Sequence, residues 1–420
     1  MNLRLFPATL SGRIKAIASK SVAHRLLICA AFADRPTDIL CEETNRDITA
    51  TAACLSSLGA TVERVGSRYR VTPLQSLPAH ATLPCGESGS TLRFLVPVVA
   101  ALGIRASFQM EGRLPDRPLS PLREELEAHG IRFSPVGSNP LSMEGTLCGD
   151  DFSIAGNVSS QFISGLLFAL SLRSTPSILT VTGEIESAPY LDMTADALTL
   201  FGADPHRQGN EYRISVCGRL VSPTTLSVEG DWSNAAFLLA AGAIGSDPVT
   251  VFGLNPRSHQ GDRAIASLLK EFGAQVTEEN GAYTVSPAPL HGITLDASQI
   301  PDLVPILATV ASVAEGETRI VGASRLRLKE SDRLCSVSQM LTDLGARICE
   351  TEDGLVIRGV PCLKGGRVSS FNDHRIAMSA AIASSVCNAP VIIEGAEAVE
   401  KSYPAFWRDL GSLGASAETV

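Results

Sequence analysis

Aromatic residues and long apolar runs are scarce in this sequence. Phe, Trp and Tyr make up 5% of its 420 residues, and the formal net charge is −9 at pH 7. A nucleic-acid-binding protein usually presents a basic surface with aromatic side chains for base stacking, so this composition argues against that class. The most apolar stretches, such as 237–244, are far shorter than the ~18 residues of a membrane-spanning helix and indicate buried helices. We therefore expect no nucleic-acid partner and no membrane partner.

The sequence also lacks the cysteine patterns of metal sites. No two of its ten cysteines form a CxxC pair, and none cluster with the spacing of metal ligands. Most stand among apolar residues, where a thiol packs as a small hydrophobic group. Because the first residues show no leader-like apolar segment, we expect reduced thiols and a cytoplasmic protein. The cysteines are Cys29, Cys41, Cys54, Cys85, Cys148, Cys217, Cys335, Cys349, Cys362 and Cys387.

A short phrase recurs six times along the chain: a bulky residue, then glycine, usually followed by alanine. Successive glycines stand 71, 72, 71, 72 and 69 residues apart, which is typical of internal repeats. Glycine directly after a helix adopts a left-handed conformation that other residues resist, so each copy is predicted to end a helix. The glycines are Gly59, Gly130, Gly202, Gly273, Gly345 and Gly414.

A polar cluster stands about 40 residues before each of these glycines and leads into an apolar run. Each run is predicted to form a buried helix of about 10–14 residues. Strand hairpins are predicted after several of the glycines, at 62–71, 276–285 and 348–357. The repeating unit is therefore helix, strand, helix, hairpin. The six clusters are 19–21, 87–90, 159–161, 231–234, 300–302 and 372–375.

The six repeats predict two lobes. A single hydrophobic core stops growing at about 250–300 residues, so a chain of 420 residues should contain two or more domains. Few residues follow Gly414, so the last repeat is truncated, and the segment before residue 19 has the pattern of a strand. Our hypothesis is that the N-terminal strand completes the last repeat. The predicted lobes are 20–227, and 1–19 with 228–420, joined by crossovers near 17–20 and 226–231.

The helix starts are predicted to bind anions. A helix N-terminus offers unpaired N–H groups and a partial positive charge, and several such ends facing one cleft would make an anion site. Cationic side chains stand at or near these starts: Lys20, Arg25, Arg93 and Arg375. Ser, Asp and Asn are also ordinary N-caps, and we interpret the cluster at 231–234 as mainly structural.

Four charged loops add to this pattern: 113–119, 325–333, 372–375 and 400–404. Arginine grips carboxylate and phosphate as a planar fork, so the loops suit substrates with several negative groups. Asp302 and Glu330 are the acids best placed among cations for proton transfer. Each could instead be a plain salt-bridge partner. His374 could act as a base, although a hydrogen-bonding role is the preferred interpretation.

These segments, in this order, resemble the enolpyruvyl transferase family, and within it the 5-enolpyruvylshikimate-3-phosphate synthases. The resemblance implies an α/β fold of two lobes, each built from three βαβαββ repeats, with an active-site cleft between the lobes. The motifs that carry it are spread over the whole chain: 19–25, 86–93, 116–119, 156–162, 187–190, 300–302, 328–333, 372–375 and 401–404.

The resemblance also implies a reaction. The 5-hydroxyl of shikimate 3-phosphate adds to C2 of phosphoenolpyruvate while C3 is protonated, and the tetrahedral intermediate then loses phosphate and a proton. This is a step of aromatic amino-acid biosynthesis. It implies two small-molecule substrates, no cofactor, no metal and a monomer. The protein then has to position two polyanions, stabilise charge and move protons.

The same resemblance assigns site residues. For catalysis it implies Asp302 as the hydroxyl base and Glu330 as the acid–base group near C3, with help from Lys20. For shikimate 3-phosphate it implies Lys20, Ser21, Arg25, Ser159, Ser160, Gln161, Ser187, Tyr190, Asp302 and Lys329. For phosphoenolpyruvate it implies Lys20, Gly89, Arg117, Gln161, Arg333, Arg375 and Lys401.

Three positions depart from the family's common pattern. Glu87 and Arg325 stand where many members have asparagine, and Ala188 replaces a common lysine. An acid at position 87 is unexpected beside an anionic ligand. The resemblance therefore carries no expectation about sensitivity to glyphosate, the inhibitor of the family.

Two other functions remain as alternatives. The sister enzyme that acts on UDP-N-acetylglucosamine shares the fold, but its members usually have a cysteine where this chain has Gly112 and an asparagine where it has Ser21. An RNA-end-processing or RNA-binding protein of related repeats would need the basic, aromatic face that the composition disfavours. A catalytically inactive binding module is disfavoured because the charged motif residues are all present.

Overall fold

Five of the six polar clusters begin an α-helix in the computed structural model, which describes residues 1–216 and 219–420. In each, a Ser or Asp side chain accepts a hydrogen bond from a backbone N–H of the first turn, as an N-cap does. The helix lengths of 10–14 residues confirm the prediction. The helices and their caps are α1 (Lys20–Ala31; Ser19), α3 (Gly89–Leu102; Ser88), α5 (Ser160–Ser171; Ser159), α7 (Trp232–Ile244; Asp231) and α11 (His374–Ala383; Asp373). Cys217 lies outside the described residues.

The remaining cluster, at 300–302, differs from the prediction. It opens the 3-10 helix η3 (Pro301–Leu303), which runs directly into α9 (Val304–Ala311). With 8 residues, α9 is shorter than the predicted 10–14. The reason is local, because Pro301 and Pro305 both lack the N–H that an α-helical turn uses, and the entry closes as a tighter 3-10 turn.

The six repeat glycines each follow a helix, as predicted. Their φ angles lie between 81° and 112°, the region that glycine alone adopts easily. Each stands one residue after the C-cap of its helix. The six helices are α2 (Arg46–Ser57), α4 (Leu122–Ala128), α6 (Ala188–Leu200), α8 (Ile265–Glu271), α10 (Arg333–Asp343) and α12 (Phe406–Ser412).

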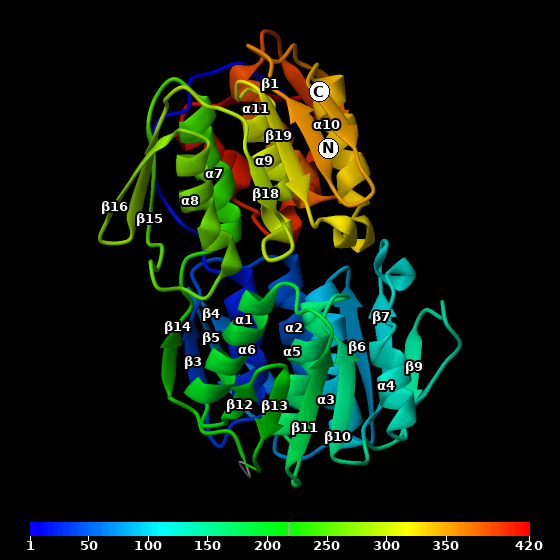
Figure 1. Ribbon diagram of the computed structural model, residues 1–420. Coiled ribbons are helices and arrows are strands. Elements are labelled where there is room, and N and C mark those ends of the chain that lie inside the picture. Colours follow the sequence, from blue (N-terminus) through cyan, green and yellow to red (C-terminus); the bar gives the residue numbers. More distant parts are fainter. Residues whose placement is uncertain (217–218) are drawn as a thin grey trace. The chain divides into compact units, whose positions relative to one another are not determined.

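The chain divides into two compact units, whose helices and strands are labelled in Figure 1. The N-terminal unit is Ala18–Val228, and the C-terminal unit is Met1–Ile17 with Glu229–Val420. The lobe boundaries predicted from the sequence remain a prediction, and this division supports it.

The N-terminal unit contains three four-stranded sheets. In spatial order they are β14 (Thr225–Ser227), β3 (Thr37–Leu40), β5 (Arg68–Thr72) and β4 (Thr61–Val65); β6 (His80–Gly86), β7 (Arg105–Met110), β9 (Leu141–Glu144) and β8 (Arg132–Phe133); and β10 (Asp151–Ala155), β11 (Ser177–Thr182), β13 (Glu211–Ile214) and β12 (Pro205–Gln208). The 3-10 helix η1 (Leu114–Asp116) follows β7.

The C-terminal unit also contains three four-stranded sheets. They are β2 (Gly12–Lys15), β15 (Val249–Phe252), β17 (Ala282–Ser286) and β16 (Gln275–Glu279); β18 (Thr294–Asp296), β19 (Glu317–Val321), β21 (Leu355–Arg358) and β20 (Arg347–Glu350); and β22 (Gly366–Ser369), β23 (Val391–Glu394), β1 (Asn2–Phe6) and β24 (Ser416–Thr419). Its short 3-10 helices are η2 (Gly261–Ala264), η4 (Ser324–Leu328), η5 (Ser384–Val386) and η6 (Ala396–Lys401).

All six sheets share one pattern: two parallel strands, followed by an antiparallel pair. This pair is a hairpin in five of the sheets, whereas in the last sheet it joins β1 with β24 from opposite ends of the chain. The three predicted hairpins are confirmed, with Val62 opposite Val71, Val276 opposite Val285 and Ile348 opposite Ile357. The leading segment was predicted as one strand that completes the last repeat, but it forms two strands. Strand β1 pairs with β23 and β24 of the last sheet, whereas β2 pairs with β15 of the fourth repeat. Residues 7–11 connect the two strands without regular secondary structure, which lets the strands reach different sheets.

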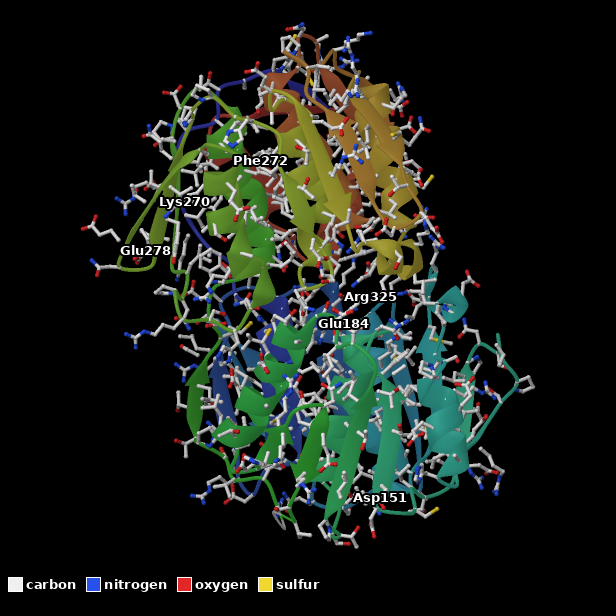
Figure 2. All side chains as sticks on the ribbon, viewed as in Figure 1. Asp151, Glu184, Lys270, Phe272, Glu278 and Arg325 are labelled. Atoms are coloured by element: carbon white, nitrogen blue, oxygen red, sulfur yellow. The ribbon has the colours of Figure 1, made fainter. Side chains whose placement is uncertain are left out.

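Each unit has its own apolar core, in which the helices of the predicted apolar runs are buried on most sides. In the C-terminal unit Phe272 lies inside, whereas Lys270 and Glu278 are exposed (Figure 2). Among the described residues, none of the helices combines the length and the apolarity that crossing a bilayer requires. The helix starts, where polar side chains interrupt these cores, position the residues of the candidate site.

Candidate active site

The start of α1 holds Lys20 in place. Ser19 caps the helix, and Lys20 is its first residue. The Lys20 ammonium donates to Oδ2 of Asp47 in α2 at 3.0 Å, with both side chains 16% exposed. A lysine held at a helix N-terminus adds a full charge to the partial positive charge of the helix end. This position suits a phosphate or a carboxylate.

Arg25 connects α1 with α6 inside the N-terminal unit. Its guanidinium donates to the Ser21 carbonyl at 2.7 Å, to the Tyr190 carbonyl at 2.9 Å and to Thr194 Oγ1 at 2.9 Å. Burial lowers the pKa of Arg25 to about 10, so the side chain stays charged at neutral pH. Ser187, which precedes α6, has φ 56°, a strained value for a residue with a side chain. Arg25 therefore brings Ser21, Ser187 and Tyr190 into one neighbourhood.

The starts of α3 and α5 are joined through Gln161. Its amide nitrogen donates to Ser90 Oγ at 2.9 Å, and its amide oxygen accepts from Arg93 Nη1 at 3.0 Å. Arg93 also donates to the Pro118 carbonyl at 3.1 Å, which ties the loop that carries Arg117 to the same helix. Ser159 caps α5, and Ser160 is its first residue.

Gly89 allows two guanidinium groups to approach the start of α3. A Cβ atom at this position would stand 2.7 Å from Arg117 Nη1 and 2.9 Å from Arg93 Nη1. Real Cβ atoms essentially never come so close to another heavy atom. Two fork-shaped cations beside the N–H groups of a helix end form an arrangement that favours a small dianion.

In the C-terminal unit, a buried arginine is surrounded by three carboxylates. Arg333 is 2% exposed and donates to Asp302 at 2.7 Å, to Glu330 at 2.7 Å and to Asp373 at 2.8 Å. Burial works to lower the pKa of Arg333, but Asp373, Glu330 and Asp302 together raise it above the usual value. The guanidinium is therefore always charged, and it fixes the two acids that the sequence singled out.

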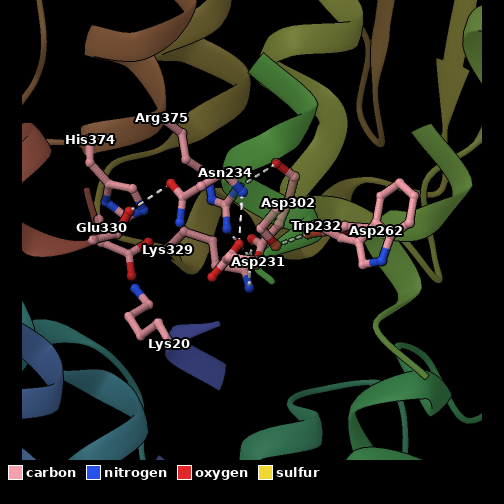
Figure 3. A network of polar contacts seen from close by, with 12 residues as sticks. Lys20, Asp231, Trp232, Asn234, Asp262, Asp302, Lys329, Glu330, His374 and Arg375 are labelled. Atoms are coloured by element: carbon pink, nitrogen blue, oxygen red, sulfur yellow. Dashed lines mark hydrogen bonds and ion pairs between the residues drawn. The ribbon is translucent and has the colours of Figure 1, made fainter. Parts of the chain in front are cut away.

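Asp302 contacts two further cations, as Figure 3 shows in part. Its carboxylate lies 3.2 Å from Arg375 Nη2 and 3.6 Å from Lys329 Nζ. Burial works to raise the pKa of Asp302, but Arg375, Lys329 and Arg333 overcome it and hold this pKa well below its usual range. Burial also lowers the pKa of Lys329, against the opposite effect of Asp302. Asp302 is thus an ionised acceptor surrounded by cations.

The start of α11 completes this group. Asp373 caps the helix through the backbone N–H of Arg375 and also accepts from Ser331 Oγ at 3.1 Å. The Lys401 ammonium donates to the Asn372 carbonyl at 2.7 Å, which places it beside the same helix end. His374 is buried, with Nδ1 3.9 Å from Asp373. The preference for a hydrogen-bonding His374 remains a prediction.

Each unit thus brings its own predicted residues together. In the N-terminal unit they are Lys20, Ser21, Gly89, Arg117 and Gln161, with Arg25, Ser159, Ser160, Ser187 and Tyr190. In the C-terminal unit they are Asp302, Lys329, Glu330, Arg333, Arg375 and Lys401. Sequence reasoning gave no role to Asp47, Asp373 or Asp262. Asp373 stands in a motif that was recognised, so its N-cap position could have identified it, whereas no local signal marks Asp262.

Two departures from the family pattern have a structural account. The Glu87 side chain packs against Gly112, where a Cβ would stand within 2.3 Å of Glu87 Oε2. Gly112 has φ 54°, so the loop needs glycine here both for its conformation and for the acid beside it. Arg325 donates to the Ser298 carbonyl at 2.8 Å and so braces the loop before Lys329.

Comparison with solved structures identifies the class. An EPSP synthase from Acinetobacter baumannii superimposes with a TM-score of 0.81 and 26% identity, covering 100% of both chains. The enolpyruvyl transferase NikO from Streptomyces tendae gives a TM-score of 0.77 at 16% identity, covering 99% of this chain and 98% of its own, which shows a shared fold. Together with cationic helix starts suited to polyanions, this defines an enzyme of the enolpyruvyl transferase class.

The chain belongs to the EPSP synthase (3-phosphoshikimate 1-carboxyvinyltransferase) family, whose model matches residues 6–410. A 3-phosphoshikimate 1-carboxyvinyltransferase from Clostridium kluyveri is 42% identical over 412 residues, covering 97% of this chain and 96% of its own. One from Clostridium perfringens is 41% identical over 414 residues, covering 97% of each. The enzyme transfers the enolpyruvyl group of phosphoenolpyruvate to shikimate 3-phosphate, a step of the shikimate pathway that serves aromatic biosynthesis. The names of these relatives specify shikimate 3-phosphate as the acceptor, rather than the UDP-N-acetylglucosamine considered as an alternative above.

Proposed function

We propose that Asp302 takes the proton of the 5-hydroxyl of shikimate 3-phosphate as its oxygen adds to C2 of phosphoenolpyruvate. Glu330, assisted by Lys20, delivers a proton to C3 in this addition and removes one when phosphate leaves. The proposal rests on one observation: a single buried arginine, Arg333, holds both carboxylates at 2.7 Å. Two acids fixed by one rigid fork keep a defined separation, which general acid–base catalysis requires.

The cations around Asp302 give it a basicity that depends on the substrate. Burial acts to raise the pKa of Asp302, but Arg375, Lys329 and Arg333 hold it well below its usual range. A carboxylate with such a low pKa is a weak base. When these arginines also bind the negative charges of phosphoenolpyruvate, they lower the pKa of Asp302 by less. The base therefore becomes active when its substrate is bound.

We propose the remaining residues as anion-binding groups. Helix ends and fork-shaped cations supply charge-assisted hydrogen bonds without a cofactor. For shikimate 3-phosphate these are Lys20, Ser21, Arg25, Ser159, Ser160, Gln161, Ser187, Tyr190, Asp302 and Lys329. For phosphoenolpyruvate they are Lys20, Gly89, Arg117, Gln161, Arg333, Arg375 and Lys401.

We further propose a cytoplasmic monomer that binds neither nucleic acid nor membranes. Nine cysteines of the described residues are free thiols, which suits a reducing compartment. In the part of the chain that the structure describes, no group of three or more His, Cys, Asp or Glu side chains is arranged to hold a metal ion. Size-exclusion chromatography with light scattering tests the monomer, and a mass of two chains would contradict it.

Gly89→Ala tests the anion site at α3. The new methyl group pushes against Arg117 Nη1, which stands 2.7 Å from the Cβ position. Losing one charge-assisted hydrogen bond to phosphoenolpyruvate raises its KM by about tenfold or more, with a smaller change in the KM of shikimate 3-phosphate. Steady-state phosphate release measures both constants. Gly411→Ala is the matched control, because nothing lies within 4 Å of that Cβ. Equal effects of the two variants would contradict the assignment.

Glu330→Gln tests the proton transfer at C3. The amide keeps the shape of the side chain but cannot exchange protons, so we expect kcat to fall by about 100-fold. In deuterated water, incorporation of deuterium at C3 of recovered phosphoenolpyruvate should fall in parallel, as measured by NMR. Glu394→Gln is the control, since Glu394 forms an exposed pair with Arg367. Wild-type exchange in Glu330→Gln would remove Glu330 from this role.

A further inference from the structure

Asp262 is a buried acid that the proposed chemistry does not use. It lies in η2 of the C-terminal unit and is 1% exposed. Ser233 of α7 donates a hydrogen bond to its Oδ2. Its other oxygen, Oδ1, is buried without a hydrogen-bond partner among the described residues. Burying an ionised carboxylate oxygen without a hydrogen bond is unfavourable in free energy, and protonation of the carboxyl removes much of this penalty.

The charged groups around Asp262 also favour its protonated form. Figure 3 shows it in one polar cluster with Asp231, Asp302 and Arg375. Asp231 caps α7, Asp302 comes from η3 and Arg375 from α11, while Arg263 of its own element donates to the Pro256 carbonyl instead. Burial first, and then the charge of Asp302, raise the pKa of Asp262 to about 6, against the effects of Arg375 and Ser233. Asp262 therefore titrates close to neutral pH.

We propose that Asp262 is a positioning residue that controls Arg375 by holding or releasing a proton. When neutral, Asp262 leaves the Arg375 guanidinium to Asp302 and to an incoming anion. When ionised, it competes with that anion for the same positive charge. The inference rests on the proposed role of Arg375 in binding phosphoenolpyruvate. By linkage, binding of phosphoenolpyruvate favours the protonated form, so the complex takes up a proton near pH 6.

The sign of the pH effect follows from this coupling. Below pH 6 Asp262 is neutral in the free enzyme and adds no repulsion. Above pH 6 it is ionised, and the affinity for phosphoenolpyruvate falls by on the order of fivefold, the size of a strongly screened interaction between unit charges. The phosphate of the substrate also titrates with pH, but it does so equally for every variant. The ratio of KM between wild type and variant therefore isolates the protein group.

The test measures KM for phosphoenolpyruvate from pH 5 to 8 in wild type, Asp262→Asn and Ser233→Ala. In Asp262→Asn the step near pH 6 disappears, so the ratio of wild-type to variant KM rises about fivefold across it. In Ser233→Ala the step moves to higher pH, because the lost hydrogen bond stabilised the ionised form. The matched control Asp343→Asn, an exposed acid on α10, keeps the wild-type profile. A wild-type profile in Asp262→Asn overturns the inference.

Two further measurements keep the result interpretable. Arg375→Met, measured in the same series, should weaken phosphoenolpyruvate binding at every pH. If it does not, the proposed role of Arg375 fails and the inference fails with it; if it does while Asp262→Asn retains the step, only the inference fails. Thermal unfolding measured against pH distinguishes a titrating Asp262 from one with a purely structural role. Because the raised pKa of Asp262 costs stability as the pH rises from about 4 to 6, Asp262→Asn should gain stability relative to wild type over that range and keep the gain above it. Parallel curves would overturn the inference.

Discussion

Asp302→Asn is expected to lower kcat by about 10²–10⁴-fold, the range of a lost general base. The asparagine amide fills the same space but cannot accept the hydroxyl proton. The KM for phosphoenolpyruvate should not rise, and it should fall if anything. Asp302 forms ion pairs with Arg333 at 2.7 Å and with Arg375 at 3.2 Å. Without its carboxylate, both guanidinium groups are available to a bound anion. Steady-state phosphate release at saturating shikimate 3-phosphate measures both constants.

This opposite movement of kcat and KM separates a catalytic role from damage to the fold. A misfolded site would lose turnover and substrate binding together. Asp343→Asn, the same change at an exposed position of α10, serves as the control. A kcat within tenfold of wild type would show that Asp302 is only an ion-pair partner, the alternative that the sequence left open.

Arg333→Met is expected to lower the free energy of unfolding by about 3–5 kcal/mol, the cost of breaking a buried ion pair. The guanidinium is 2% exposed and neutralises Asp302, Glu330 and Asp373. Methionine fills part of the volume but leaves three partly or fully buried carboxylates without this partner. Chemical denaturation followed by circular dichroism measures the loss. Arg358→Met is the control, because the 71% exposed Arg358 pairs with Glu317 at the surface, and we expect it to cost about 0–1 kcal/mol.

The pH dependence of this variant provides a second check. In wild type the pKa of Asp302 lies below its usual range, so its ion pairs stabilise the fold above about pH 4 and are lost as the pH falls further. In Arg333→Met, Asp302 loses one of the cations that lower its pKa and protonates more easily, so the difference in unfolding free energy from wild type should narrow as the pH is lowered. If the difference in unfolding free energy from wild type does not change with pH, or if Arg358→Met loses as much stability, the cost of Arg333→Met comes from packing alone.

Local signals explain why so much of the fold could be predicted. A glycine after each helix and a capping side chain before the next are backbone requirements, and they act within a few residues of where they stand. The prediction went wrong where partners are distant in the chain. Strand β2 pairs with β15, about 240 residues away, and no pattern within residues 12–15 specifies that partner. The shorter α9 was predictable from Pro301, in the polar cluster 300–302, and from Pro305, in the apolar run that follows it.

The candidate site divides in the same way. Lys20, Arg333 and Arg375 were predicted because they stand in charged segments at helix starts. Their partners were not, since Arg333 reaches Asp302 and Asp373 across 31 and 40 residues of chain. Asp262 was missed altogether, because its importance comes from burial beside Asp302 rather than from any neighbour in the sequence.

The most direct test of this account is phosphate release from phosphoenolpyruvate in a single turnover, for wild type and Asp302→Asn. Each enzyme is mixed with shikimate 3-phosphate, with UDP-N-acetylglucosamine or with no acceptor. We expect rapid release only by wild type with shikimate 3-phosphate, and slow release by Asp302→Asn although both substrates still bind. Equally rapid release by both enzymes would contradict the assignment of Asp302 as the base on which the account depends.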